Sequence, residues 1–126
     1  MNLKTIFRRL ILLDLSLIIL IIIGAFFESE TVLKFNEITT FSDSLLLIVL
    51  VWLLAYFVNL FLLYKFKSIG KQIYLILFIV LMVLSLLSPP NAMDSWLYVL
   101  DGLGMANSGA ILVLLYFSPI KKEFEK

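Results

Sequence analysis

Residues 45–64 read LLLIVLVWLLAYFVNLFLLY, and this stretch decides the class of fold because it contains no charged residue. The hydrocarbon core of a bilayer is about 30 Å thick, so a helix that crosses it needs about 20 consecutive, mostly apolar residues. The stretch has that length, and as a helix it would be apolar on every face. Residues 45–64 are therefore expected to lie in lipid.

Three other segments resemble this one, and together they account for a chain that is 63% hydrophobic and only 15% charged. Soluble domains are roughly 45–50% apolar and about 25% charged. The last segment is the least apolar and could be kinked or re-entrant, but its apolar end at residues 111–117 favours a full crossing. We expect an all-α membrane protein with a single domain, residues 1–126, whose four transmembrane helices form an antiparallel up-down bundle. The expected spans are residues 10–27, 45–64, 69–88 and 96–117.

The basic residues predict how the spans are oriented. All but one of the ten lysines and arginines fall before the first span, between the second and third, or after the fourth, and only Lys34 lies on the other side. Basic residues remain on the cytoplasmic side, so both termini are expected inside, in a cell membrane that we take to be a bacterial inner membrane. The basic residues on that side are Lys4, Arg8, Arg9, Lys65, Lys67, Lys71, Lys121, Lys122 and Lys126.

The outer loop, residues 28–44, is acidic, and we interpret it as a solvated connector. A short interfacial helix around Thr31–Phe35 is the alternative. A cleaved signal peptide is disfavoured for the first segment, because its apolar run is too long, contains Asp14 and precedes no small-residue cleavage site.

The chain has no cysteine and no histidine. This excludes disulfides, thiolate chemistry and Cys/His metal sites, and it removes the commonest general base. We found no phosphate-binding glycine loop, nucleophile elbow or paired carboxylates. We therefore expect no enzymatic activity, no cofactor, no metal and no nucleic-acid partner.

Asp14 interrupts an apolar segment, and a charge at the centre of a bilayer costs about 2.5–3.5 kcal/mol. It lies about 7–8 Å inside the basic end of its helix, at 1.5 Å per residue. Asn59 lies at a similar depth on the second span and shares a helix face with Trp52, Ala55 and Tyr56. We expect this face to meet Asp14 inside the bundle. The carboxyl group then either responds to a proton or cation, or lies near enough to the interface to reach water or a basic side chain.

Helical periodicity sorts the polar and small residues of the fourth segment onto two nearly opposite faces. Each face has a functional and a structural interpretation, since polar side chains line pathways or join helices, and small residues let helix backbones approach closely. Asp101 is expected near the outer end with Ser85 as a partner, and too far from Asp14 in depth to act with it. The polar face holds Asp101, Gly104, Asn107 and Ser108, and the small-residue face holds Gly102, Ala106, Gly109 and Ala110.

Two classes of function remain open. In the first, the protein associates with other membrane proteins or with itself through its fourth helix, in an accessory, assembly or immunity-type role. In the second, it is a small oligomeric channel or a proton- or cation-coupled transporter that uses its intramembrane polar residues. The first is favoured, because polar residues inside membranes are more often structural. The expected partners are the lipid bilayer and a membrane protein or a second copy.

Overall fold

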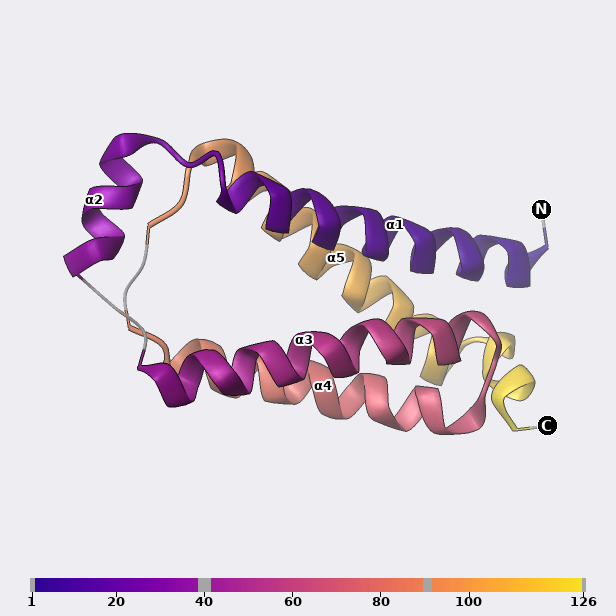
Figure 1. Ribbon diagram of the computed structural model, residues 1–126. Coiled ribbons are helices and arrows are strands. Elements are labelled where there is room, and N and C mark those ends of the chain that lie inside the picture. Colours follow the sequence, from indigo (N-terminus) through magenta and orange to yellow (C-terminus); the bar gives the residue numbers. More distant parts are fainter. Residues whose placement is uncertain (1, 39–41, 90–91, 126) are drawn as a thin grey trace.

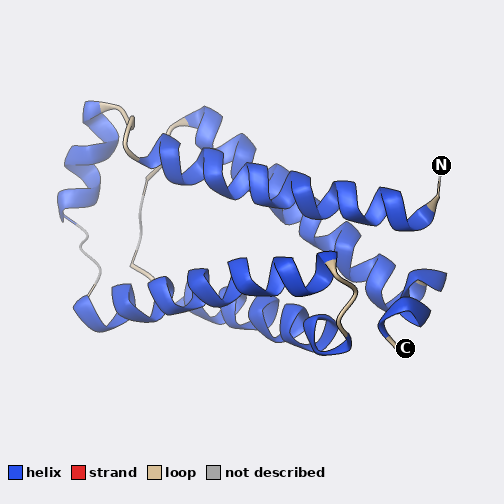
Figure 2. Ribbon diagram, turned by 45° about the vertical axis from the view of Figure 1, so that its right-hand side comes forward, coloured by secondary structure: helices blue, strands red, loops and turns tan. Residues whose placement is uncertain are grey.

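The computed structural model describes residues 2–38, 42–89 and 92–125 (Figure 1). Every regular element in these ranges is a helix (Figure 2). The five α-helices are α1 (Leu3–Ala25), α2 (Glu30–Ile38), α3 (Asp43–Tyr64), α4 (Ser68–Leu87) and α5 (Ser95–Phe117), and a 3-10 helix, η1 (Pro119–Phe124), follows them.

Three of these helices, α3, α4 and α5, are long and apolar enough to cross a membrane on their own. A fourth candidate is formed by α1 and α2 taken together, with a bend of 83° between them. The first helix is more polar because it includes Arg8, Arg9 and Asp14. The coarser prediction is thus confirmed for the described residues: the protein is all-helical, and several of its helices are long and apolar enough to cross a membrane.

The helix bounds differ from the predicted spans mainly at the amino terminus. The first helix begins at Leu3, because the Asn2 side chain caps it by accepting a hydrogen bond of 3.0 Å from the Lys4 N–H. A run of apolar residues predicts only the part of a helix that lies in lipid. The helix itself can extend beyond that run, as α1 does between residues 3 and 9. Residues 95–117 form one continuous helix, so α5 is neither broken nor re-entrant within the described chain.

The long helices pack as two pairs, α1 with α5 and α3 with α4. Successive long helices run in opposite directions, and the two pairs diverge toward the end where α2 lies (Figure 1). The two pairs meet at the other end, which holds both termini and the turn between α3 and α4. The core there comprises Phe7, Ile11, Tyr56, Leu60, Leu63, Tyr74, Leu77, Ile111, Leu115, Ile120 and Phe124.

Aromatic packing closes the end that holds the termini. The Phe124 ring of η1 lies 5.7 Å from the Phe7 ring and 5.4 Å from the Phe66 ring, in edge-to-face arrangements that favour the contact. Phe66 adopts a left-handed backbone with φ of 56°, which ends α3 and turns the chain into α4. Lys4 and Glu123 form a salt bridge of 2.9 Å beside this cluster.

The opposite end departs from the sequence prediction, because the outer loop contains α2 and is not simply a solvated connector. The Asn36 side chain exchanges two hydrogen bonds with the Ala92 backbone, at 3.0 and 2.9 Å. The Ser29 N–H donates a hydrogen bond of 2.8 Å to the Asp94 carboxyl. These contacts tie the segment to the chain just before α5. Residues 39–41 of the predicted loop lie outside the described part of the structure.

Candidate functional site

A buried carboxyl group lies where the two helix pairs begin to diverge. Asp14 on α1 is only 2% exposed, and its carboxyl group accepts a hydrogen bond from the Tyr56 hydroxyl on α3. That hydroxyl also lies 3.2 Å from the Tyr74 hydroxyl on α4, within hydrogen-bonding distance. Phenolic groups from two helices thus surround a carboxyl group from a third.

No salt bridge to Asp14 occurs among the residues that the structure describes. A carboxylate moved out of water is costly unless a cation or several hydrogen bonds compensate it. The cluster supplies hydroxyl groups and the nearby amide of Asn107, but no positive charge. Among the described residues, hydrogen bonds alone compensate the Asp14 carboxyl group.

Two polar residues that the sequence analysis singled out on α5 are buried in the structure. Asn107 and Ser108 are buried, and the Asn107 amide donates a hydrogen bond of 3.0 Å to the main-chain carbonyl of Leu10. This bond joins α5 to α1 about one helical turn before Asp14. Asn107 therefore joins two helices, and Ser108 lies beside the polar cluster.

Trp52 completes the arrangement on the side of α3. Its indole N–H donates a hydrogen bond of 2.9 Å to the main-chain carbonyl of Leu77, which fixes the ring between α3 and α4. The ring also stacks on Tyr56, with centroids 5.0 Å apart and planes inclined by 24°. Both aromatic rings are thus held in place by hydrogen bonds at their polar ends.

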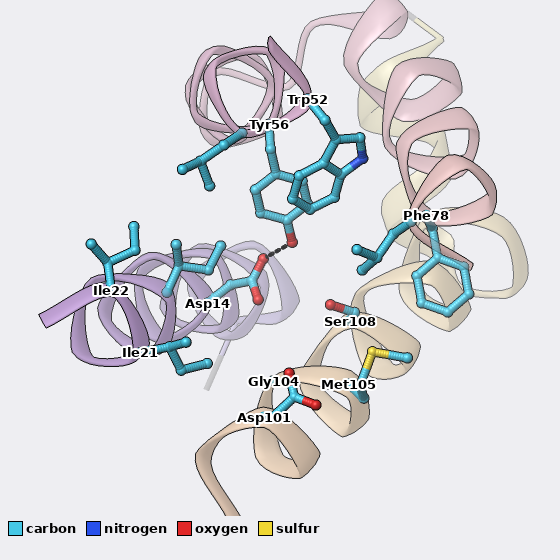
Figure 3. A pocket seen from close by; sticks show the side chains of 13 residues that line it. Asp14, Ile21, Ile22, Trp52, Tyr56, Phe78, Asp101, Gly104, Met105 and Ser108 are labelled. Atoms are coloured by element: carbon cyan, nitrogen blue, oxygen red, sulfur yellow. Dashed lines mark hydrogen bonds between the residues drawn. The ribbon is translucent and has the colours of Figure 1, made fainter. Parts of the chain in front are cut away.

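A cavity of about 210 Å³ lies between α1, α3, α4 and α5, and its lining includes Asp14, Trp52, Tyr56 and Ser108. Figure 3 shows Asp14 and Tyr56 on one side of it and Asp101, Met105 and Ser108 of α5 on the other. The two carboxyl groups therefore share one cavity. Sequence reasoning had separated Asp14 from Asp101 by depth, and it could not foresee the space left between diverging helix pairs.

The suggested partner of Asp101 is not supported. Ser85 lines a different cavity, and its hydroxyl donates a hydrogen bond of 2.9 Å to the Leu81 carbonyl of its own helix. A serine in an apolar helix commonly satisfies itself in this way.

The predicted face of α3 is correct in part. Trp52 and Tyr56 meet the cavity, whereas Ala55 is exposed on the outside of the helix pair. Asn59 is buried, at 1% exposure, and neither polar atom of its side chain has a hydrogen-bond partner among the described residues. Tyr56, rather than Asn59, is the residue that contacts Asp14.

The small-residue face of α5 is not covered by any other part of the chain that the structure describes. Gly102, Ala106 and Ala110 are exposed, and Gly109 is half-buried. A Cβ atom added at Gly102 or Gly109 would meet no atom within 4 Å. Within the described chain, no other helix packs on this face.

Sequence reasoning missed one glycine that does bring helices together. A Cβ atom at Gly24 of α1 would lie 2.5 Å from side-chain atoms of both Trp96 and Leu97 on α5. Gly24 therefore permits the close approach of α1 and α5 at the end of the molecule near α2. The sequence signal that could have indicated this contact is a single glycine within the apolar segment of residues 10–27.

The described chain is a set of helices, several of them long and apolar enough to cross a membrane, with a largely apolar cavity between two helix pairs that carries the carboxyl groups of Asp14 and Asp101. No group of three or more metal-ligating side chains occurs in the described part of the chain. We found no match to this chain among protein-family models, curated proteins or solved structures.

Proposed function

We propose that the protein is a non-enzymatic, multi-pass membrane protein with both termini in the cytoplasm. The described basic residues of both termini and of the turn between α3 and α4 support this topology, because those three places lie at one end of the molecule (Figure 1). Lys34 lies on α2 at the other end. This orientation follows the rule that lysine and arginine residues stay on the cytoplasmic side of a membrane. With both termini on that side, α1 must cross the membrane as well, which gives four crossings.

Within that membrane, the protein associates with another membrane protein or with a second copy through α5. The observation that carries this proposal is the uncovered small-residue face, where Gly102 and Gly109 leave room for a helix to approach closely. In lipid, helices gain little from the hydrophobic effect, so close packing of backbones drives their association. A face of small side chains on which no other described helix packs is suited to that role.

The test compares association of the parental protein with that of Ala106→Leu and Gly109→Leu, by cross-linking in membranes and native mass spectrometry. Both substitutions place a bulky side chain on the proposed contact face, and association should be lost. Ala55→Leu is the matched control, because it makes the same change at an exposed alanine of α3. Unchanged association in both α5 variants would reject this function.

A second candidate function is a small oligomeric channel or a proton- or cation-coupled transporter. It is favoured by one specific observation, the shared cavity with carboxyl groups from α1 and α5. Intramembrane ionisable residues that face a cavity mark ion and proton pathways in many membrane proteins. Four helices enclose little space, so several copies would have to form a complete pathway.

Flux into proteoliposomes distinguishes this candidate from association alone. The parental protein should carry protons or cations faster than empty vesicles, and Asp14→Asn and Asp101→Asn should each reduce that flux. Equal flux from the parental protein, from both variants and from empty vesicles would remove the transport function.

A further inference from the structure

We propose that the cavity between α1, α3, α4 and α5 binds a hydrophobic organic cation. Its ammonium charge would be held by Asp14 and Asp101, and its apolar part would lie against Trp52. This inference goes beyond association through α5. It deepens the cation-coupled function by naming a class of ligand, and to that extent it rests on that function.

The sign of the ligand's charge follows from the lining of the cavity. Asp14 and Asp101 face it from different helices, and no lysine or arginine lines it among the described residues. An anion would be repelled by both carboxylates, and a neutral ligand would leave them without compensation. A single positive charge beside Asp14 reduces the cost of holding that buried carboxylate away from water, and the exposed Asp101 carboxylate adds a second negative charge at the same cavity.

The aromatic residues favour an organic cation over a metal ion. Ammonium groups are attracted to the faces of tryptophan and tyrosine rings within about 6 Å of the ring centre. Trp52 and Tyr56 offer stacked rings that are held in place by hydrogen bonds to Leu77 and Asp14. Calcium takes about six to eight oxygen ligands and magnesium about six, whereas the rest of the lining is largely aliphatic.

The size of the cavity limits the ligand to about one ring. An apolar cavity of about 150 Å³ accepts benzene, so the 210 Å³ found here has room for one ring and a small ammonium group. Residues such as Ile18, Ile22 and Phe78 supply the apolar surface that such a ring requires.

The test uses benzyltrimethylammonium as the probe and 2,2-dimethylpropylbenzene, in which carbon replaces the charged nitrogen, as its neutral match. The full chain has two tryptophans, so a Trp96→Phe background in detergent micelles makes Trp52 the only tryptophan reporter. The cation should change Trp52 fluorescence saturably, and the neutral compound should bind at least about tenfold more weakly. Equal binding of the two compounds, or no saturable signal, would overturn the proposal.

Variants place the binding in this cavity. Asp101→Asn and Asp14→Asn should each weaken binding at least about tenfold. Gly104→Leu should abolish it, since Gly104 lines the cavity and a Cβ atom there meets nothing within 4 Å, so the added side chain fills the space. Ala55→Leu, outside the cavity, should bind like the parental protein.

If Asp14→Asn fails to fold, Gly104→Leu and Asp101→Asn still decide the matter, because neither replaces a buried side chain. Undiminished binding in both would contradict the proposal. Saturable binding without any flux in proteoliposomes would support the ligand site and reject transport. Flux without saturable binding would overturn the ligand site and leave transport standing.

Discussion

The Tyr56 hydroxyl donates a hydrogen bond to the carboxyl group of Asp14, and this contact ties α3 to α1 at the edge of the cavity. The same hydroxyl lies 3.2 Å from that of Tyr74 on α4. One side chain thus connects the α1–α5 pair to both helices of the other pair. Because the pairs diverge beyond this point, the stability of the whole arrangement should depend on it.

Tyr56→Phe should destabilise the protein by about 1–3 kcal/mol, because it removes a donor from a buried carboxyl group. Unfolding in mixed detergent micelles, followed by circular dichroism, measures the change. Tyr98→Phe is the matched control, since Tyr98 is largely exposed on α5, and it should alter stability by no more than about 0.5 kcal/mol. Equal effects of the two substitutions would show that the contact contributes nothing.

Asn59→Leu should have the opposite effect and stabilise the protein. The Asn59 amide is buried with no hydrogen-bond partner among the described residues, and an unsatisfied buried polar group costs about 1–3 kcal/mol. Leucine keeps the branching at Cγ and removes that cost. The same unfolding assay in micelles reports the gain.

Asn36→Leu is the contrasting variant. Asn36 uses its amide in two hydrogen bonds with the Ala92 backbone, so its replacement should lower stability. A loss of stability in Asn59→Leu comparable to that in Asn36→Leu would mean that the Asn59 amide does have a partner in the membrane.

The positions of the helices could be predicted from sequence because lipid imposes a simple rule. Each run of about 20 apolar residues satisfies its own backbone as a helix, whatever its neighbours are. The predicted second span, residues 45–64, and the observed α3, Asp43–Tyr64, differ by two residues at one end. The two additional residues follow Ser42, which caps the helix: its hydroxyl accepts a hydrogen bond of 3.2 Å from the Leu45 N–H.

Periodicity could also predict that Asp14 meets the face of α3 that carries Tyr56, because residues three and four apart share a helix face. Which side chain of that face makes the contact depends on the distance and tilt between helices. The distance and tilt between helices cannot be read directly from sequence. For that reason Asn59 was expected beside Asp14, whereas Tyr56 makes the contact and Tyr74 lies next to it. The cavity shared by Asp14 and Asp101 also arises from divergence of the pairs, which is a tertiary property.

Gly24→Leu should destabilise the contact between α1 and α5. Even a Cβ atom at this position would lie 2.5 Å from Leu97 and Trp96, and overpacking of this kind costs about 1–3 kcal/mol or more. Gly102→Leu is a matched substitution, because a Cβ atom there meets nothing within 4 Å. It should leave the unfolding transition of the detergent-solubilised monomer unchanged. Equal destabilisation by both would indicate that glycine acts through backbone freedom rather than through close approach.

Phe124→Ala should release the 3-10 helix η1 from the end of the molecule that holds the termini. Phe124 is buried against the rings of Phe7 and Phe66. Truncation of a buried phenylalanine costs about 3–5 kcal/mol in a core. Here η1 is terminal and can detach locally, so the cost should appear as opening of the tail rather than as global unfolding.

Limited proteolysis measures that opening, because trypsin cleaves after Lys121 and Lys122 only when η1 has left its place. The variant should be cleaved there faster than the parental protein, while the helices embedded in the micelle remain protected. Glu125→Ala, at the exposed end of the same segment, should be cleaved at the parental rate. If both variants are cleaved equally fast, the aromatic cluster does not hold the tail, and the salt bridge between Lys4 and Glu123 becomes the contact to remove next.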